Sequence, residues 1–162
     1  MDEKAIIDAA MAEWESICAA APAQSDETVR LLEEFVGKTF SRIERIVVHR
    51  GRSGGEELRF IQANGDLVEM SHDQDCCEGV WIDDICGDLD DLIGKPILWA
   101  EEVTSKSDEA PKLGSGHIDE SHTWTFYKMR TSAGEVTIRW YGTSNGYYSE
   151  SVDIRTVPAK AA

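Results

Sequence analysis

Two neighbouring segments near the C-terminus carry the residues best suited to bind a small molecule. Trp124 and Phe126 alternate along one apolar segment, and Arg139 lies between Ile138 and Trp140 in the next. Since side chains alternate between the two faces of a strand, Trp124 and Phe126 share a face. A guanidinium in such a setting requires an anion, which is either a carboxylate of the same chain or the phosphate of a ligand.

The turn after the second segment adds an amide and two more rings. Asn145, Tyr147 and Tyr148 surround Gly146 in this turn. Aromatic rings stack on nucleobases, an arginine clamps phosphate, and an amide reads the edge of a base or a ribose. This combination predicts a nucleotide pocket. An internal pair between Arg139 and a carboxylate is the structural alternative.

Two polar segments suggest catalysis or metal binding instead. The acidic run over 83–91 offers oxygen ligands for Mg²⁺, although Asp88 also suits a helix N-cap. Cys76 and Cys77, close to His72, could supply a thiolate nucleophile or metal ligands, but adjacent cysteines are poorly spaced for zinc. The sequence contains no P-loop, dinucleotide-binding, nucleophile-elbow, zincin or EF-hand motif. We therefore assign no catalytic residue, no metal ligand and no cofactor.

Composition narrows the class of protein further. The 162 residues include 16 basic and 31 acidic ones, for a net charge of −15. This charge argues against binding to DNA or to an anionic membrane. No apolar run is long enough to span a bilayer, and the acidic start does not resemble a signal peptide. We expect a cytosolic protein whose four cysteines are reduced.

The elements that must position these residues follow from the spacing of apolar side chains. An apolar stripe predicts a helix over 2–20, and Ser25 is placed to cap a second helix over 26–36. After residue 39 the period becomes two, which predicts an antiparallel meander with a hairpin turn at Asn64–Gly65. A short helix begins at Asp88. Further strands are expected near 80–85, 97–103, 124–129, 136–141 and 147–154, with a long polar loop over 104–121. The expected fold class is α+β.

Basic residues gather in the meander, although the chain as a whole is acidic. They form either a solvated face or a groove for an anion, and the sequence leaves both open. The residues are Arg42, Arg45, Arg50, Arg52 and Arg59.

Several blocks of sequence carry a resemblance to a known family. They are QDCCE at 74–78, IDDI at 82–85, GDLDDLIG at 87–94, AEE at 100–102, TWTFYK at 123–128, IRWYG at 138–142 and SNGYYSE at 144–150. In this order they resemble the Thoeris anti-defence sponges of the first-described type, which are small phage-encoded proteins. The resemblance runs from about residue 38 to 155, so residues 1–37 form an arm and 38–158 the sponge-like domain.

The resemblance implies a function without catalysis. Such proteins are homo-oligomers in the host bacterial cytoplasm, here a dimer or a hexamer. They hold a cyclic ADP-ribose isomer made by a TIR protein, and some also bind CBASS cyclic oligonucleotides, at sites between subunits. Our ligand residues are chosen by chemistry: Trp124, Phe126, Arg139, Asn145, Tyr147 and Tyr148, with Arg42 and Arg45 as clamps from a partner subunit. The alternatives are an enzyme that degrades a cyclic nucleotide and an antagonist that docks on a host protein through the N-terminal arm.

Overall fold

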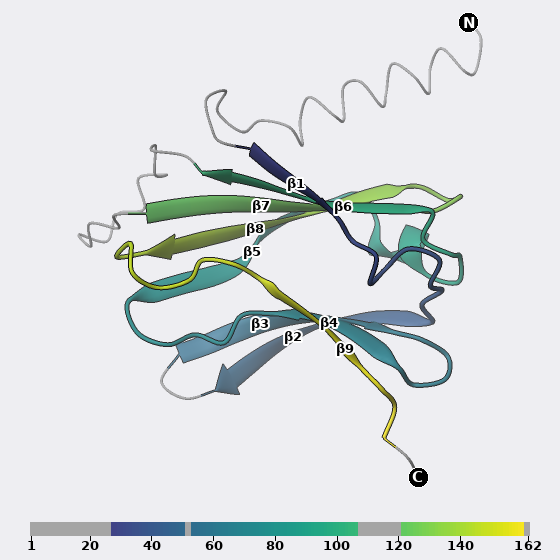
Figure 1. Ribbon diagram of the computed structural model, residues 1–162. Helices are drawn as coiled ribbons and strands as arrows, with labels where there is room; N and C mark the ends of the chain where they lie inside the picture. Colours follow the sequence, from purple (N-terminus) through teal and green to yellow (C-terminus); the bar gives the residue numbers. More distant parts are fainter. Residues whose placement is uncertain (1–26, 51–52, 107–120, 161–162) are drawn as a thin grey trace, which may run out of the picture.

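The protein is a sandwich of two antiparallel β-sheets (Figure 1). We describe it from a computed structural model, in which residues 27–50, 53–106 and 121–160 are described. The five-stranded sheet has the order β1 (Glu27–Leu31), β6 (Trp99–Lys106), β7 (Ser121–Arg130), β8 (Glu135–Ser144) and β5 (Glu78–Cys86). The four-stranded sheet has the order β2 (Arg42–Arg50), β3 (Ser53–Ile61), β4 (Leu67–Ser71) and β9 (Asp153–Val157).

The core lies between the two sheets and follows from the period-two pattern. In β8, Ile138 and Trp140 point into the core, whereas Arg139 and Tyr141 point to the opposite face. The four-stranded sheet contributes fully buried residues such as Phe60. Each apolar side chain buried in this way stabilises the fold by about 1.5–3 kcal/mol. The alternation therefore divides each strand into two sets of side chains, and one set forms the core.

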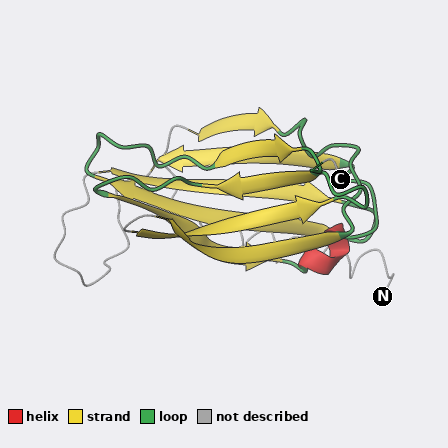
Figure 2. Cartoon of the chain, turned by 90° about the horizontal axis from the view of Figure 1, so that it is seen from below, coloured by secondary structure: helices red, strands yellow, loops and turns green. Residues whose placement is uncertain are grey.

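The expected α+β class is wrong, because the described residues are almost entirely antiparallel strand (Figure 2). The helix expected after the central strand is a single 3₁₀ turn, η1 (Leu89–Leu92). The Asp88 carboxylate does accept a hydrogen bond from the Asp90 amide at 2.9 Å, as an N-cap should. One capped turn does not continue as an α-helix here, since Ile93 already has an extended backbone.

The helix expected over 26–36 is also wrong. Glu27–Leu31 forms β1, which pairs with β6 from Glu27 opposite Ser105 to Leu31 opposite Glu101. The edge of β6 offers unpaired backbone groups, and pairing with them overrides the weaker local preference for a helix. Leu32 and Phe35, just after β1, are fully buried. The helix expected over 2–20 lies outside the described residues.

The last expected strand is misplaced. The segment over 145–152 is a loop, and the strand that follows, β9, belongs to the other sheet. This loop therefore joins the two layers of the sandwich (Figure 1). Across the described ranges, no helix has the length and apolar character needed to cross a membrane.

Candidate ligand-binding cleft

A cleft of about 310 Å³ lies at one end of the sandwich, where the inward face of β6 and β7 extends past the core. Tyr127 and Met129 of β7 are core residues, and Thr125 and Thr123 continue the same face toward the cleft. Residues of the 145–152 loop form the facing wall. Hydroxyl groups dominate the lining: Thr104, Ser121, Thr123, Thr125, Tyr127, Tyr148, Ser149 and Ser151.

Two carboxylates supply the charge of the cleft. The two Glu150 oxygens accept hydrogen bonds from the hydroxyls of Thr123 at 2.5 Å and Ser144 at 2.6 Å. Glu102 forms an ion pair with Arg30 at 3.2 Å. No described lining residue is cationic. The cleft is therefore suited to groups that donate hydrogen bonds, such as sugar hydroxyls, and it disfavours phosphate.

The hydroxyl of Tyr127 remains a donor inside this cleft. Burial raises its pKa well above the ordinary value, and the charge of Glu102 raises it further. The inner end of the cleft thus has a protonated phenol beside a carboxylate.

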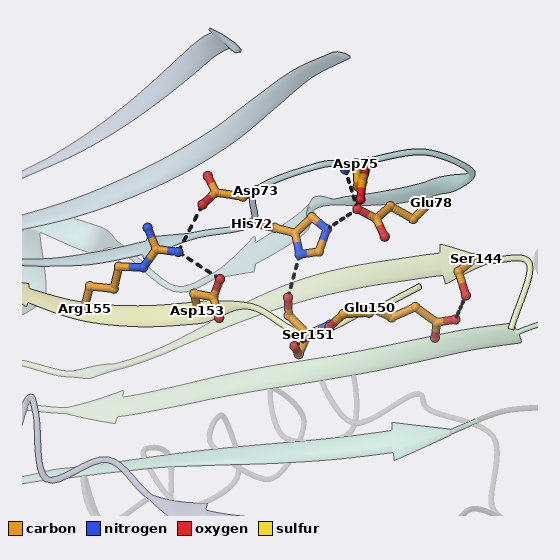
Figure 3. A network of polar contacts seen from close by, with 10 residues as sticks. His72, Asp73, Asp75, Glu78, Ser144, Glu150, Ser151, Asp153 and Arg155 are labelled. Carbon is orange, nitrogen blue, oxygen red and sulfur yellow. Dashed lines mark hydrogen bonds and ion pairs between the residues drawn. The ribbon is translucent and has the colours of Figure 1, made fainter. Parts of the chain in front are cut away.

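A polar network fastens the 145–152 loop to the loop before β5 (Figure 3). His72 Nδ1 donates to the Ser151 carbonyl at 2.8 Å, and Nε2 lies 3.1 Å from the Glu78 carboxylate. The ring therefore bridges the Ser151 carbonyl and the Glu78 carboxylate. The same Glu78 oxygen accepts from the Asp75 amide at 2.6 Å. The wall of the cleft is therefore held by side chains more than 60 residues away in sequence.

Two further contacts hold the 145–152 loop in place. Arg155 bridges Asp73 at 3.1 Å and Asp153 at 3.2 Å (Figure 3), and Asp73 raises the pKa of Arg155. Gly142 of β8 lies directly against the loop, because a Cβ there would meet the Glu150 carbonyl oxygen at 2.6 Å. A glycine is needed at this position for the close approach of the two backbones.

Three of the residues chosen from the sequence lie in the 145–152 loop. Tyr148 lines the cleft, and its ring meets that of Tyr147 edge-on at 5.2 Å. Tyr147 is 86% exposed. Asn145 accepts a hydrogen bond from the Tyr147 amide at 3.1 Å through its side-chain oxygen. The structure thus brings these three residues together in one loop, and of the three only Tyr148 is among the lining residues of the cleft.

Trp124, Phe126 and Arg139 lie on the opposite face of the five-stranded sheet. The Arg139 guanidinium lies over the Trp124 ring at 5.3 Å and contacts the Asp83 carboxylate with an Nε distance of 2.7 Å. The partner of Arg139 in this chain is thus a carboxylate. A register shift in β5 between Ile82 and Asp84 places the adjacent carboxylates of Asp83 and Asp84 beside Arg139.

Arg42 and Arg45 lie on β2 in the other sheet. Arg42 contacts Glu44 at 2.7 Å, and Arg45 contacts Glu56 at 2.6 Å. The second oxygen of Glu56 accepts from the Ile82 amide at 3.0 Å, so this pair also links the two sheets. Neither arginine lines the cleft.

Sequence reasoning missed the hydroxyl wall of the cleft. The available signal was the alternation of Ser121, Thr123 and Thr125 along one face of a strand whose other positions are aromatic. Attention to the aromatic residues selected the wrong face for the cleft. Glu102 and Glu150 were also missed, because nothing local distinguishes them from other acidic residues. Within the described residues, no group of three His, Cys, Asp or Glu side chains could hold a metal ion.

Comparison with known proteins gives one match, which is to a family model. No curated protein matches the chain, and no solved structure matches it. Residues 33–154 match a family described as a domain of unknown function, DUF7448. The matched segment includes both sheets except β1 and the end of β9, and it contains all the cleft residues named above. The chain therefore belongs to the DUF7448 family.

Proposed function

We propose that this protein binds a cyclic nucleotide in the cleft and holds it without cleaving it. The proposed ligand is a cyclic ADP-ribose isomer made by a TIR protein of the host bacterium, in the cytoplasm where a phage anti-defence protein would act. CBASS cyclic oligonucleotides are the second ligand class to test. The resemblance to Thoeris anti-defence sponges motivates the choice of ligand, and the cleft supplies the physical argument.

The observation that carries the proposal is a hydroxyl-lined and carboxylate-lined cleft beside two accessible tyrosine rings. Carboxylates accept hydrogen bonds from ribose hydroxyls, and Glu102 and Glu150 lie in the lining. Tyr147 and Tyr148 offer ring faces or edges for a base, at about 1–3 kcal/mol per stacked base. A ligand with two riboses joined to one base matches this arrangement of groups.

The phosphates of such a ligand need cations that the described lining lacks. In the proposal these come from a second protomer, and Arg42 and Arg45 on β2 are the candidates. Both side chains are about half exposed or more, at 63% and 46%. Exchanging Glu44 for phosphate at Arg42 costs little, because exposed ion pairs contribute about 0–1 kcal/mol. At Arg45 the phosphate would add to the pair with Glu56, which is mostly buried and also accepts a hydrogen bond from the Ile82 amide. A homo-oligomer, either a dimer or a hexamer, would place the site between subunits.

A depletion and recovery experiment tests the proposal. The protein is incubated with the product of a TIR enzyme at equal concentration, the free ligand is removed, and the protein is heat-denatured. We expect the ligand to disappear from solution and to return chemically unchanged, with a dissociation constant near nanomolar, or about −12 kcal/mol. Recovery of a cleaved nucleotide would instead identify an enzyme. The absence of depletion would exclude sequestration.

Matched threonine variants locate the site. Thr123→Val and Thr125→Val remove hydroxyls from the cleft while keeping shape, and Thr137→Val removes an equally buried hydroxyl from the opposite face. Each lost hydrogen bond weakens binding by about 0.5–1.5 kcal/mol, or roughly twofold to thirteenfold. Isothermal titration should show this loss for the first two variants and unchanged affinity for the third. Equal losses in all three would argue against the cleft.

A truncation separates sequestration from protein antagonism. Removing residues 1–37 would delete β1 and the buried Leu32 and Phe35, so loss of activity would only report unfolding. Removing residues 1–26 leaves every described strand intact. We expect this shorter protein to bind the ligand with unchanged affinity. An antagonist that docks through its N-terminal arm would lose its activity.

A further inference from the structure

We propose that Cys76 and Cys77 are a reversible redox site, which closes into a disulfide between adjacent residues. Their sulfur atoms lie 2.7 Å apart, and both residues are exposed. A disulfide has a sulfur–sulfur distance of about 2.05 Å, so only a small approach separates the two states. Neither thiol has a role in the proposed ligand site.

The local backbone explains why adjacent side chains meet here. Neighbouring side chains in an extended segment point to opposite sides, which would keep two thiols apart. Cys77 has a φ of +63°, the only positive φ at a non-glycine residue within the described ranges. This left-handed conformation is uncommon outside glycine, asparagine and aspartate. It reverses the alternation and turns both sulfurs to the same side.

The reaction is thiol–disulfide exchange with a low-molecular-weight disulfide such as oxidised glutathione. One cysteine thiolate attacks the oxidant, forms a mixed disulfide and releases one molecule of reduced glutathione. The neighbouring thiol loses its proton and attacks the mixed disulfide, which releases the second molecule. The protein is oxidised by two electrons and loses two hydrogens, and the oxidant is reduced to two thiols.

The resulting ring should be easy to reduce. Adjacent Cα atoms across a trans peptide are about 3.8 Å apart, whereas disulfides usually join Cα atoms about 4.4–6.8 Å apart. A ring closed at the shorter distance is strained, and strained, exposed disulfides are the labile ones. We therefore expect the pair to respond to the ratio of oxidised to reduced glutathione rather than to stay oxidised.

Negative neighbours set the pH dependence of the reaction. The hydrogen bond and charge of Cys77 raise the pKa of Cys76, and Asp75 and Glu78 raise it further. Tyr148 is a further titratable group near the pair, and His72 contacts Glu78 beside it. Since the thiolate is the nucleophile, a raised pKa slows exchange at neutral pH, and the rate should rise as the solution becomes alkaline.

Oxidation would reach the cleft through one hydrogen bond and one electrostatic effect. The Cys77 carbonyl accepts a hydrogen bond from the Asn145 amide at 3.2 Å, at the start of the loop that walls the cleft. Cys76 also raises the pKa of Tyr148, which lines the cleft. Closing the ring would turn the Cys76–Cys77 peptide and weaken the bond to Asn145. This consequence rests on the proposed function, whereas the redox chemistry does not.

Peptide mapping tests the redox site in the full chain. The reduced protein is equilibrated with mixtures of oxidised and reduced glutathione, quenched with acid, alkylated and digested. Mass spectrometry should show the peptide with both cysteines two hydrogens lighter and unalkylated, and a reductant should restore it. A glutathione adduct that persists on the wild-type peptide, or a bond to Cys86, to Cys18 or to another chain, would overturn the proposal.

Cysteine variants test whether Cys76 and Cys77 are the two residues that form the disulfide. Cys77→Ser removes the resolving thiol, so Cys76 should accumulate a glutathione adduct. A double variant with Cys18→Ser and Cys86→Ser should still close the ring, and failure to do so would count against the pair. Ligand affinity of the oxidised and reduced protein is measured separately. We expect at least a threefold weaker affinity after oxidation, and equal affinities would overturn the link to the cleft while leaving the mass result to judge the redox site.

Discussion

The two faces of the five-stranded sheet are built from the same strands but do different things. Along β7, Thr123 and Thr125 face the cleft, whereas Trp124 and Phe126 face the other side. On that other side the rings contact one another: Tyr141 lies 4.5 Å from Trp124 and 5.0 Å from Trp81. Rings engaged in this way stabilise the face turned away from the four-stranded sheet, whereas the cleft lies on the inward face, where hydroxyls follow the core residues along β7. Aromatic content alone is thus a poor guide to where a ligand binds.

The two faces also differ in how charge is balanced. On the aromatic face, Arg139 is 25% exposed and is paired with Asp83, so its charge is compensated within the chain. In the cleft, Glu102 is paired with Arg30, whereas Glu150 accepts hydrogen bonds from the hydroxyls of Thr123 and Ser144. A carboxylate that has only neutral donors can exchange them for the hydroxyls of a ligand at modest cost. This difference makes Glu150, rather than Glu102, the carboxylate best placed to meet a ligand.

The largest expected effect comes from removing a ring on the aromatic face. Tyr141 is 2% exposed and also contacts His122, whose Nδ1 lies 2.5 Å from the phenol oxygen. Tyr141→Ala removes these contacts and leaves a cavity, which should lower the free energy of unfolding by about 3 kcal/mol. Urea denaturation followed by tryptophan fluorescence measures the change. A loss below about 1 kcal/mol would show that this face is not part of the stable structure.

The second largest loss of stability is expected for substitution of Gly142, which packs against the 145–152 loop. Gly142→Ala places a Cβ within 2.6 Å of the Glu150 carbonyl oxygen, so the loop must move. We expect a stability loss of about 1–3 kcal/mol together with weaker ligand binding. Gly55→Ala is the matched control, because its Cβ would meet the His72 carbonyl oxygen at an ordinary 3.6 Å. Similar melting and binding for both variants would contradict the close packing described here.

A smaller effect is expected for the paired arginine of the aromatic face. Arg139→Ala removes a partly exposed ion pair and a contact with the Trp124 ring. Partly exposed pairs and cation–π contacts each contribute about 1 kcal/mol or less, so the protein should stay folded and lose about 1 kcal/mol. Titration should show ligand binding at the cleft unchanged. A large loss of affinity in a folded variant would instead show that Arg139 takes part in ligand binding.

The smallest loss of stability is expected for substitution of Tyr147, which should nevertheless weaken ligand binding. Tyr147 is 86% exposed, so Tyr147→Ala should change the free energy of unfolding by less than about 0.5 kcal/mol. If a base stacks on this ring, affinity should fall by about 1–3 kcal/mol. Tyr147→Phe keeps the ring and should bind normally. Unchanged affinity for the alanine variant would remove Tyr147 from the site.

Much of the strand structure could be predicted from the sequence, because alternation is a local property. The strands that contain Trp124 and Arg139, and the meander with its turn at Gly65, whose φ is +89°, are present in the structure. The helix over 26–36 could not be excluded locally, since the apolar spacing also suits one helical face. What decided it was an unpaired edge on β6, a strand about 70 residues further along the chain.

The candidate site was predictable only in part. The loop with Asn145, Tyr147 and Tyr148 was found from residue types, while its shape was not, because the chain leaves one sheet there and enters the other. Glu102 and Glu150 lie far apart in sequence and become part of one site only after β6, β7 and the loop assemble. Whether that site binds a cyclic nucleotide remains a prediction until the depletion experiment is done.

The sequence by itself determined the period of the strands, the acidic balance of the chain, the Asp88 cap and the adjacency of Cys76 and Cys77. Only the tertiary structure decided which face of the five-stranded sheet packs against the other sheet and carries the cleft, and which carboxylate each arginine meets. The physical reason is that alternation assigns side chains to faces without saying which face another sheet will cover. With 31 acidic residues against 16 basic ones, many ion pairs are feasible in sequence, and strand register selects among them.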